Sequence, residues 1–390
     1  MALIILIDRI TSAIDKGETV VGVFLDFRKA FDTVDHSILL KKLNKLGIRG
    51  VAYTFLENYL SNRCQFIEYG NLNSNRENIN CGVPQGSILG PLLFLLYIND
   101  ITNVSKLLLP IIFADDTNIF LSGKCIKETI EIMNIEIGKI NEWLQVNRLS
   151  LNIEKTHFMI FSSIRKKFTY IPDIEINGYK IKCVEQTKFI GVVLDSKLRW
   201  ERHITSVKTK IARGLGILNK AKKFFSLPTL ITLYYSFVYP HYIYCIEVWG
   251  KAANIHMDSL FKLQKRIVRS ITSSPYKTES IPLFKRLKLL TLKQIYKYRV
   301  NIFMFRFTKD MLPSIFQDMF IQNYDVSNFN TRNKFSLRIP IAKTNTFKNT
   351  IRHQGVTEWN QITRLINYNC SIHTFKNRLK NTLIHSDMLN

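Results

Sequence analysis

Three aspartates stand where a site for divalent cations could form. Asp26 directly follows an apolar run, residues 20–25, and Asp115 and Asp116 lie between two further apolar runs. Nucleotidyl transfer by two cations roughly 3.5–4 Å apart needs carboxylates held together on a rigid scaffold. Each piece alone is also typical of ordinary structure, because Asp-Asp is common at solvated turns and an Asp after a strand often caps a helix.

The neighbouring elements decide whether these aspartates meet. Residues 20–25 are wholly apolar and predict a strand buried on both faces, with Asp26 at its end. Residues 107–114 and 118–121 predict two more strands, with residues 115–117 at the turn between them. Adjacent strands would bring Asp26, Asp115 and Asp116 into one pocket.

Further segments carry ordinary signals of helix and strand. Asp35 or Ser37 caps a predicted helix that runs through Leu46, and Gly47 ends it. Residues 64–69 and 79–83 predict strands joined by a polar loop, and residues 88–98 predict a buried helix despite Pro91. Residues 126–146 predict a helix, 156–161 a strand and 178–193 a hairpin region, and the chain is mostly helical from Glu201 onward.

The charge is strongly asymmetric along the chain. Residues 1–100 hold ten Lys/Arg and ten Asp/Glu, whereas residues 201–390 hold 31 Lys/Arg and 9 Asp/Glu. Such an excess predicts a polyanionic partner, most often nucleic acid. The alternative explanation is a genome-wide bias toward lysine codons. Such a bias would not leave the first hundred residues neutral, so we favour a nucleic-acid partner. With 46% apolar and 12% aromatic residues, the chain is predicted to fold around a core.

The six cysteines contain no C-x2-C or C-x4-C spacing, which excludes zinc ribbons and knuckles and predicts free, mostly buried thiols. Residues 229–250 lack Lys and Arg, but Pro240, His241 and Glu247 favour a buried helix over a membrane span. The apolar start is too short for a secretion signal. We therefore expect an intracellular protein, nuclear or cytoplasmic, with no membrane partner.

Five segments, in order, resemble the motifs of reverse transcriptases. Residues 23–32 (VFLDFRKAFD) resemble the first palm motif, and residues 82–87 (GVPQGS) with 90–94 (GPLLF) the second. Residues 113–116 (FADD) resemble the catalytic hairpin, 149–156 (LSLNIEKT) the fourth motif and 188–192 (KFIGV) the primer grip. Residues 30–36 (AFDTVDH) are similar to jockey-like, LINE-type non-LTR retrotransposons. The resemblance is strong over about the first 200 residues and weak beyond them.

This resemblance implies an α/β (α+β) palm of a right-hand polymerase, followed by a mostly helical basic thumb and a C-terminal region. We place the palm at residues 1–195, the thumb-like region at 196–275 and a basic region of unknown role at 276–390. The implied function is RNA-directed DNA polymerase, transferring dNTPs onto a primer 3′-hydroxyl by a two-metal mechanism. The implied partners are an RNA template, a DNA primer or target, and dNTPs.

The resemblance also assigns roles near the aspartates. Asp26, Asp115 and Asp116 would hold two Mg²⁺ ions, with Mn²⁺ as a substitute, and the backbone carbonyl of Phe27 would be a further ligand. Phe31 matches a steric gate against the ribose 2′-hydroxyl, although its residue type fits a core position equally well. Gln85 and Gly86 match the loop beside the incoming nucleotide, where glycine permits close backbone approach.

Further positions match groups that would act on pyrophosphate and on the primer. Lys155 matches a position that supplies a proton or positive charge to pyrophosphate, and a surface lysine is an even alternative. Lys188 and Gly191 would position the primer, although a plain β-turn would look the same.

Basic helical segments would track the template–primer backbone through phosphate contacts. The basic residues that we assign to this role are Lys208, Lys222 and Lys223, although any one such lysine is commonly just a solvated side chain. The aromatic residues nearby are predicted core side chains rather than stacking platforms. They are Phe224, Phe225, Tyr234, Tyr235 and Tyr239.

The chain departs from the family pattern at its start. Only 25 residues precede Asp26, where the family carries a fingers region that grips the triphosphate. The resemblance therefore predicts an N-terminally truncated enzyme. Two other readings stay open: a catalytically inactive retroelement remnant that binds RNA or DNA through its basic half, and a polymerase of intron-maturase type. The sequence of residues 30–36, AFDTVDH, favours the LINE-type enzyme over the maturase.

Overall fold

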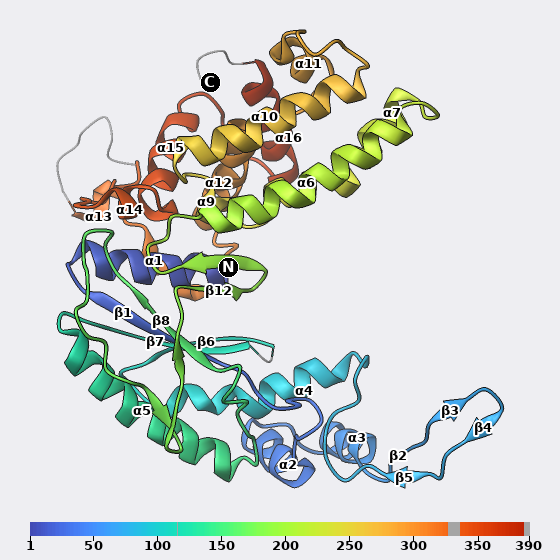
Figure 1. Ribbon diagram of the computed structural model, residues 1–390, viewed down its shortest axis with the longest axis vertical. Coiled ribbons are helices and arrows are strands. Elements are labelled where there is room, and N and C mark those ends of the chain that lie inside the picture. The colour runs from blue at the N-terminus through green and yellow to red at the C-terminus, as the bar shows by residue number, and fades with distance from the viewer. Residues whose placement is uncertain (115, 327–335, 386–390) are drawn as a thin grey trace. The chain divides into compact units, whose positions relative to one another are not determined.

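The computed structural model of the 390-residue chain describes residues 1–114, 116–326 and 336–385. Within these ranges the chain forms two compact units (Figure 1). One unit contains residues Gly17–Glu185, and the other combines Met1–Lys16 with Gln186–Asn390. The fold is mixed helix and sheet, as the sequence predicts.

The first unit is built on a five-stranded sheet with the strand order β11-β8-β1-β7-β6. All neighbours are antiparallel except β11 and β8. The strands of this sheet are β1 (Thr19–Leu25), β6 (Leu109–Phe113), β7 (Asp116–Gly123), β8 (His157–Phe161) and β11 (Lys182–Cys183). A two-stranded ribbon, β9 (Glu175–Ile176) with β10 (Tyr179–Lys180), completes the β-structure that follows β8.

Strand β1 lies in the middle of the sheet, between β8 and β7, and every one of its residues is buried. Alternation along the strand puts Val21, Val23 and Leu25 in the main core together with one face of α5 (Ile126–Val146), which lies along the sheet (Figure 1). Gly22 and Phe24 face the other way. Gly22 has no side chain because a Cβ there would come within 2.6 Å of the Phe120 ring. The predicted strand and helix are both confirmed.

Three helices extend the first unit: α2 (His36–Lys45), α3 (Val51–Leu60) and α4 (Leu89–Ile98), the last continuing as η1 (Asn99–Asn103). The carboxylate of Asp35 caps α2 by accepting from the Ile38 N–H at 3.0 Å, as predicted. Helix α4 was expected to be buried, but only one face is, since Leu92 and Leu95 are 52% and 40% exposed.

Three predictions in this unit are wrong in detail. Residues 79–83 were expected to form a strand but make only an isolated bridge between Cys81 and Asp35. The expected polar loop after residue 69 contains two strands, because Cys64 pairs with Asn78 and Glu68 with Asn73. The ladders are β2 (Cys64–Gln65) with β5 (Glu77–Asn78) and β3 (Glu68–Tyr69) with β4 (Leu72–Asn73). Side chains of these strands are exposed on both faces, so no alternation of apolar and polar residues marks the strands in the sequence.

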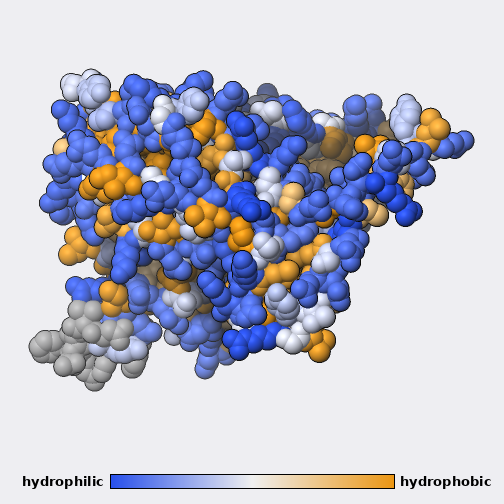
Figure 2. All heavy atoms as spheres, turned by 90° about the horizontal axis from the view of Figure 1, so that it is seen from below, coloured by the Kyte–Doolittle hydropathy of each residue, from blue (hydrophilic) through white to orange (hydrophobic). Residues whose placement is uncertain are grey.

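The hairpin formed by β2–β5 carries exposed apolar side chains. Ile67, Tyr69 and Leu72 are 75%, 85% and 75% exposed. Hydrophobic atoms are visible on the arm that projects at the right of Figure 2.

Another wrong detail is at the predicted turn of residues 115–117, where Asp116 and Thr117 belong to β7 rather than to the turn. Asp116 pairs with Phe113, so the ladder extends further than the sequence suggested.

The second unit is mostly helical. It begins with α1 (Ala2–Asp15) and resumes with the hairpin β12 (Gln186–Phe189) and β13 (Val192–Asp195). The helices that follow are α6 (Glu201–Ala221), α7 (Leu227–Phe237), α8 (Tyr239–Ile243), α9 (Ile246–Trp249), α10 (Asn254–Ile271), α11 (Ser280–Arg286), α12 (Leu292–Thr308), η2 (Ser314–Met319), α13 (Asn323–Val326), α14 (Asn345–Lys348), η3 (Ile351–Gly355), α15 (Val356–Ile362) and α16 (Ile372–His385).

Helices α6 and α10 lie side by side in this unit (Figure 1). Each buries apolar residues at three- and four-residue spacing, such as Ile204, Val207 and Ile211 on α6. Helix α12 starts with a capping box, in which Thr291 accepts from the Gln294 N–H and the Gln294 side chain accepts from the Thr291 N–H. The helical, basic second half predicted from residue 201 is confirmed.

The first helix belongs to the second unit because acidic side chains tie it to C-terminal segments. The Asp8 carboxylate lies 2.8 Å from Nε of Arg352, and the Asp15 carboxylate accepts from the Thr344 N–H at 2.6 Å. Burial raises the pKa of Asp8, and the nearby Arg352 lowers it less. The amino-terminal residues therefore pack with residues more than 300 positions away.

The cysteines are free, as predicted, but they are not mostly buried. Cys64, Cys81, Cys125 and Cys183 are exposed, because they lie in short ribbons and connections rather than in core elements. Cys245 and Cys370 are partly exposed. Within the described ranges, no helix is both long enough and apolar enough to cross a bilayer, and residues 229–250 form separate short helices instead.

Candidate active site

The β1–β7 register brings Asp26 and Asp116 to corresponding positions. Its last pair is Leu25 with Thr117. The ladder ends there, and Asp26 and Asp116 are the residues that adjoin this last pair on the two segments, so both lie at the same end of the β1–β7 ladder. Asp26 is partly exposed and Asp116 is exposed, so both carboxylates can be reached from solvent.

Asp115 lies outside the described residues. Among the residues that the structure does describe, no group of three or more His, Cys, Asp or Glu side chains is arranged to hold a metal ion. The described part of the predicted triad is therefore a pair of carboxylates, one from each of two central strands.

The backbone around Asp26 is fixed by the segment that resembles the fourth motif. The Asn152 N–H donates to the Asp26 carbonyl at 2.7 Å, and the Arg28 N–H donates to the Ser150 carbonyl at 2.9 Å. These bonds flank the bridge between Phe27 and Leu151. In such a pair the Phe27 N–H and C=O point away from residues 150–152. The Phe27 carbonyl is therefore not used by this ladder.

Thr156 ends the same segment and contacts Asp26 from the side. Its hydroxyl accepts from the Asp26 N–H at 3.3 Å, and it is fully buried. Lys155 precedes it in a turn and is exposed. The structure thus attaches Lys155 to the segment that holds Asp26, while the lysine side chain remains in solvent.

Phe31 packs against the loop that resembles the second motif. Its ring centroid lies 4.9 Å from that of Phe94, and its carbonyl accepts from the Val83 N–H at 2.8 Å. Phe31 is partly exposed, with one side on the main core. A partly exposed ring of this kind fits both the gate and the core interpretation.

The Pro84–Gly86 turn is held by its neighbours on both sides. The Gly82 N–H donates to the Val34 carbonyl at 2.7 Å, and the side chain of Gln85 donates to the Asp32 carboxylate at 2.7 Å. Gly86 has a φ of +81° with open space around its Cβ position. Both Gln85 and Gly86 are exposed. The structure therefore brings Gln85 to the segment that follows Asp26.

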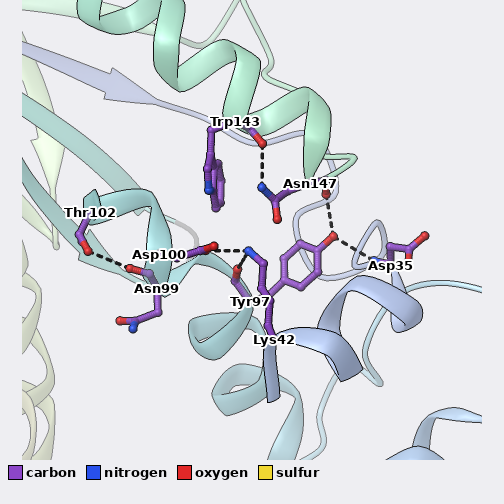
Figure 3. A network of polar contacts seen from close by, with 8 residues as sticks. All are labelled: Asp35, Lys42, Tyr97, Asn99, Asp100, Thr102, Trp143 and Asn147. Atoms are coloured by element: carbon purple, nitrogen blue, oxygen red, sulfur yellow. Dashed lines mark hydrogen bonds and ion pairs between the residues drawn. The ribbon is translucent and has the colours of Figure 1, made fainter. Parts of the chain in front are cut away.

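A partly buried polar network packs behind the segments that hold Asp26 and Gln85 (Figure 3). Lys42 donates to the Asp100 carboxylate at 2.7 Å and to the Tyr97 carbonyl at 2.6 Å, and its ammonium lies 4.9 Å and 4.7 Å from the ring centroids of Tyr97 and Trp143. Burial lowers the pKa of Lys42, an effect that Asp100 partly offsets. The network joins α2, α4 and the end of α5.

Tyr97 carries the network to the Asp26 region. Its hydroxyl donates to the Asn147 carbonyl at 2.6 Å and accepts from the Asp35 N–H at 3.4 Å (Figure 3). Asp35 in turn pairs with Arg148 at 2.6 Å. Burial disfavours the Asp35 carboxylate, but hydrogen bonds from Ser37 and Ile38 and the charge of Arg148 outweigh it and lower the pKa. These contacts anchor the start of residues 148–152, which pair with Asp26 and Arg28.

The residues predicted to grip the primer belong to the second unit. Lys188 is exposed on β12, and Gly191 turns the β12–β13 hairpin with a φ of +74°. The turn is braced by Tyr244, whose hydroxyl donates to the Ile190 carbonyl at 2.8 Å. A Cβ on Gly191 would come within 3.3 Å of the Tyr244 ring.

The predicted phosphate-binding lysines are also in the second unit. Lys208 lies on α6, and Lys222 and Lys223 follow the end of that helix, all with exposed side chains. Basic residues on α10 instead contact other residues of the chain. The Lys265 ammonium lies 4.4 Å from the Phe261 ring centroid, and Arg269 donates to the Thr278 carbonyl at 2.8 Å.

Sequence reasoning missed the residues that hold the site rather than line it. Thr156 and Asp32 contact Asp26 and Gln85 directly, and Lys42 and Tyr97 support the segments around them. Thr156 and Asp32 are the last residues of the fourth and first motif-like segments, and that position was the available signal. For Lys42 and Tyr97 nothing in the local sequence distinguishes them from helix-surface and core residues.

Comparisons with known proteins agree with the motif order. Residues 5–194 match the family described as reverse transcriptase (RNA-dependent DNA polymerase). The chain is 28% identical, over 294 residues, to the probable RNA-directed DNA polymerase from transposon X-element of Drosophila melanogaster, which covers 73% of this chain and 32% of that protein.

Two jockey proteins are similar to the same extent. The chain is 29% identical over 308 residues to the RNA-directed DNA polymerase from mobile element jockey of Drosophila melanogaster, covering 74% of this chain and 33% of that protein. For the jockey protein of Drosophila funebris the identity is 29% over 275 residues, covering 68% and 30%. The chain spans about a third of the length of these curated relatives.

Proposed function

We propose that this chain, whose residues 5–194 match the reverse transcriptase (RNA-dependent DNA polymerase) family, is the catalytic part of an RNA-directed DNA polymerase. The similarity of the chain to the X-element and jockey proteins supports a jockey-like, non-LTR retrotransposon as its source. The observation that carries the proposal is the β1–β7 register, whose last pair, Leu25 with Thr117, directly precedes Asp26 on one strand and follows Asp116 on the other. The first unit, residues 17–185, would form most of the palm, and the basic helices of the second unit would form the thumb.

The donor set near Asp26 fits hard divalent cations. Two solvent-accessible carboxylates on adjacent strands and the unused Phe27 carbonyl are oxygen ligands of the kind Mg²⁺ prefers. Asp26, Asp115 and Asp116 would hold two Mg²⁺ ions, with Mn²⁺ as a substitute. When bound, such ions lower the pKa of the attacking hydroxyl and stabilise the charge on the leaving oxygens.

The chain's own residues would select and orient the nucleotide. The Phe31 ring, fixed against Phe94, would leave no room for a ribose 2′-hydroxyl and so would favour dNTPs. The Gln85–Gly86 turn, held by Asp32, would lie against the base pair that forms. Lys155 would donate a proton, or positive charge, to the departing pyrophosphate.

Nucleic acid would be held mainly through phosphates. Lys208, Lys222 and Lys223 are exposed on or beside α6, and residues 201–390 have 31 Lys/Arg against 9 Asp/Glu. Lys188 and Gly191, on a hairpin braced by Tyr244, would position the primer. On this proposal the functional regions are a palm at 1–195, a thumb at 196–275 and a basic C-terminal region at 276–390.

Primer extension tests the proposal. The full chain, supplied with Mg²⁺, dNTPs and a DNA primer on an RNA template, should extend the primer. Asp26→Asn and Asp116→Asn should each abolish extension, whereas Asp173→Asn, an exposed carboxylate paired with Lys180 in the same unit, should not. Equal extension by the wild-type chain and both site variants would contradict the assignment of Asp26 and Asp116.

The alternative function is nucleic-acid binding without catalysis. The exposed lysines on or beside α6 support this alternative, because lysines bind phosphate without any contribution from the aspartates. Retained, salt-sensitive RNA binding with no extension by the wild-type chain would favour this alternative. A Phe31→Ala variant gives an independent check, because loss of a steric gate should increase incorporation of rNTPs relative to dNTPs.

A further inference from the structure

Four tyrosines line a cavity of about 330 Å³ in the unit that contains residues 186–390. Tyr234 and Tyr235 come from α7, Tyr239 from α8 and Tyr298 from α12. Leu289 and Leu290 add an apolar part to the wall, and Lys380 of α16 completes it. None of these residues belongs to the candidate active site.

The rings of the cavity are arranged edge to face. The centroids of Tyr235 and Tyr239 are 5.1 Å apart with the planes at 68°, and those of Tyr234 and Tyr235 are 5.4 Å apart at 76°. Tyr234 is buried and accepts from the Gln264 side chain at 3.4 Å, whereas Tyr235 is 37% exposed. The sequence predicted Tyr234, Tyr235 and Tyr239 as core side chains, but of these only Tyr234 is buried.

The cavity offers hydrogen-bonding groups as well as ring surface. In the described ranges, the hydroxyls of Tyr239 and Tyr298 have no hydrogen-bond partner within the chain. Burial raises the pKa of Tyr239 to about 12 and raises the pKa of Tyr298, so both hydroxyls stay protonated at neutral pH. Each can therefore donate and accept, as a heterocyclic ligand requires.

The charge of the cavity selects against cations. Among the described residues no carboxylate lines it, and the charged group in its wall is Lys380, whose ammonium lies 3.4 Å from the Tyr235 hydroxyl oxygen and 5.9 Å from the Tyr235 ring centroid. A fitting ligand is flat, has hydrogen-bonding edges and carries or adjoins a negative charge. A base with its phosphate has all three properties.

We propose that this tyrosine cavity takes up one unpaired nucleobase of a single-stranded nucleic acid, with the adjoining phosphate beside Lys380. This inference rests on the proposed function in so far as it takes nucleic acid as the ligand. The cavity would hold a single strand by stacking, in addition to the phosphate contacts of the lysines on α6.

The first test changes the ligand and leaves the protein intact. The full chain is titrated into single-stranded eight-nucleotide RNA and DNA oligomers that carry one 2-aminopurine, without dNTP or metal. Stacking on tyrosine should quench the fluorescence, and an oligomer with an abasic site at that position should bind roughly tenfold more weakly. Quenching in either series supports the proposal, and the stronger series identifies the nucleic acid. Equal affinity for the abasic and base-bearing oligomers would overturn it.

The second test uses paired variants. Tyr235→Ala removes a partly exposed ring of the cavity, and Tyr276→Ala removes a 78% exposed ring elsewhere in the same unit. The first should reduce binding of the base-bearing oligomer roughly tenfold and leave abasic binding unchanged, and the second should change neither. An equal loss from both variants would refute a specific cavity. The assay has no polymerase step, so its failure would leave the primer-extension result untouched.

Discussion

Replacing Gly82 by alanine should loosen the loop that carries Gln85 and Gly86. Gly82 has a φ of +88°, and a Cβ there would meet the Asp32 backbone, at 2.8 Å from its carbonyl oxygen and 2.9 Å from its Cα. The Asp32 backbone cannot move away easily, because the flanking carbonyls of Phe31 and Val34 accept from Val83 and Gly82. The substitution should therefore cost conformational strain and a backbone collision together.

Gly47 provides a matched control. Its φ is +90°, and a Cβ there would meet nothing within 4 Å. Alanine in a left-handed conformation costs about 1–2 kcal/mol, which both variants share. Overpacking against fixed atoms adds about 1–3 kcal/mol, which only Gly82→Ala should show. We expect Gly82→Ala to lose about 2–5 kcal/mol of unfolding free energy and Gly47→Ala about 1–2 kcal/mol.

Urea unfolding followed by tryptophan fluorescence measures both losses. Trp143 reports on the first unit, since it is the only tryptophan between residues 17 and 185. The Michaelis constant for dNTPs should also rise in Gly82→Ala, because the displaced loop would no longer hold Gln85 against Asp32. Equal losses in the two variants would show that the close approach of Gly82 to Asp32 does not hold the loop.

Three further outcomes follow from individual side chains. Burial lowers the pKa of His203 to about 4 from its ordinary 6.5, so its contribution to stability is complete above pH 6.5 and is lost as the pH falls toward 4. Urea unfolding at pH 7 and pH 5 should differ by about 2 kcal/mol from this group, and His203→Gln should remove that difference. Tyr97→Phe should cost about 1–3 kcal/mol in thermal unfolding by leaving a buried carbonyl unpaired, and Tyr179→Phe, on an exposed ribbon, should cost nothing measurable. Replacing Lys222 and Lys223 together by Gln should lower the slope of log affinity for RNA against log salt by about 1 for each phosphate that is no longer neutralised, and an unchanged slope would remove these lysines from the interface.

Local sequence was sufficient where a single element carried the signal. The apolar run before Asp26 predicts β1 because only a strand buried on both faces suits it, and α5 follows from its helical spacing. Residue type limited the cap of α2 to Asp35 or Ser37, and the structure shows that it is Asp35. The order of the five motif-like segments indicated the reverse transcriptase family, which the match over residues 5–194 supports.

Pairings between distant segments were beyond local sequence. The Lys42–Asp100 pair and the Tyr97–Asn147 bond join residues 58 and 50 positions apart, and no periodicity encodes them. The short ladders after residue 60 were missed because their side chains are exposed on both faces. Phe224 and Phe225 were expected in the core but are 80% and 54% exposed, since aromatic residue type does not specify which face of an element is covered.

The sequence by itself indicated the kind of chemistry that we propose, because aspartates, a Pro-Gln-Gly turn and basic segments follow one another along the chain in the order of the motifs that they resemble. Only the tertiary structure decided which groups meet. Strand register brings Asp26 and Asp116 to the same end of the β1–β7 ladder, the 150–152 segment fixes the Asp26 backbone, and four tyrosines from three helices line one cavity. The physical reason is that side-chain identity is local, whereas pairing register and packing depend on backbone hydrogen bonds and burial between segments far apart in the chain.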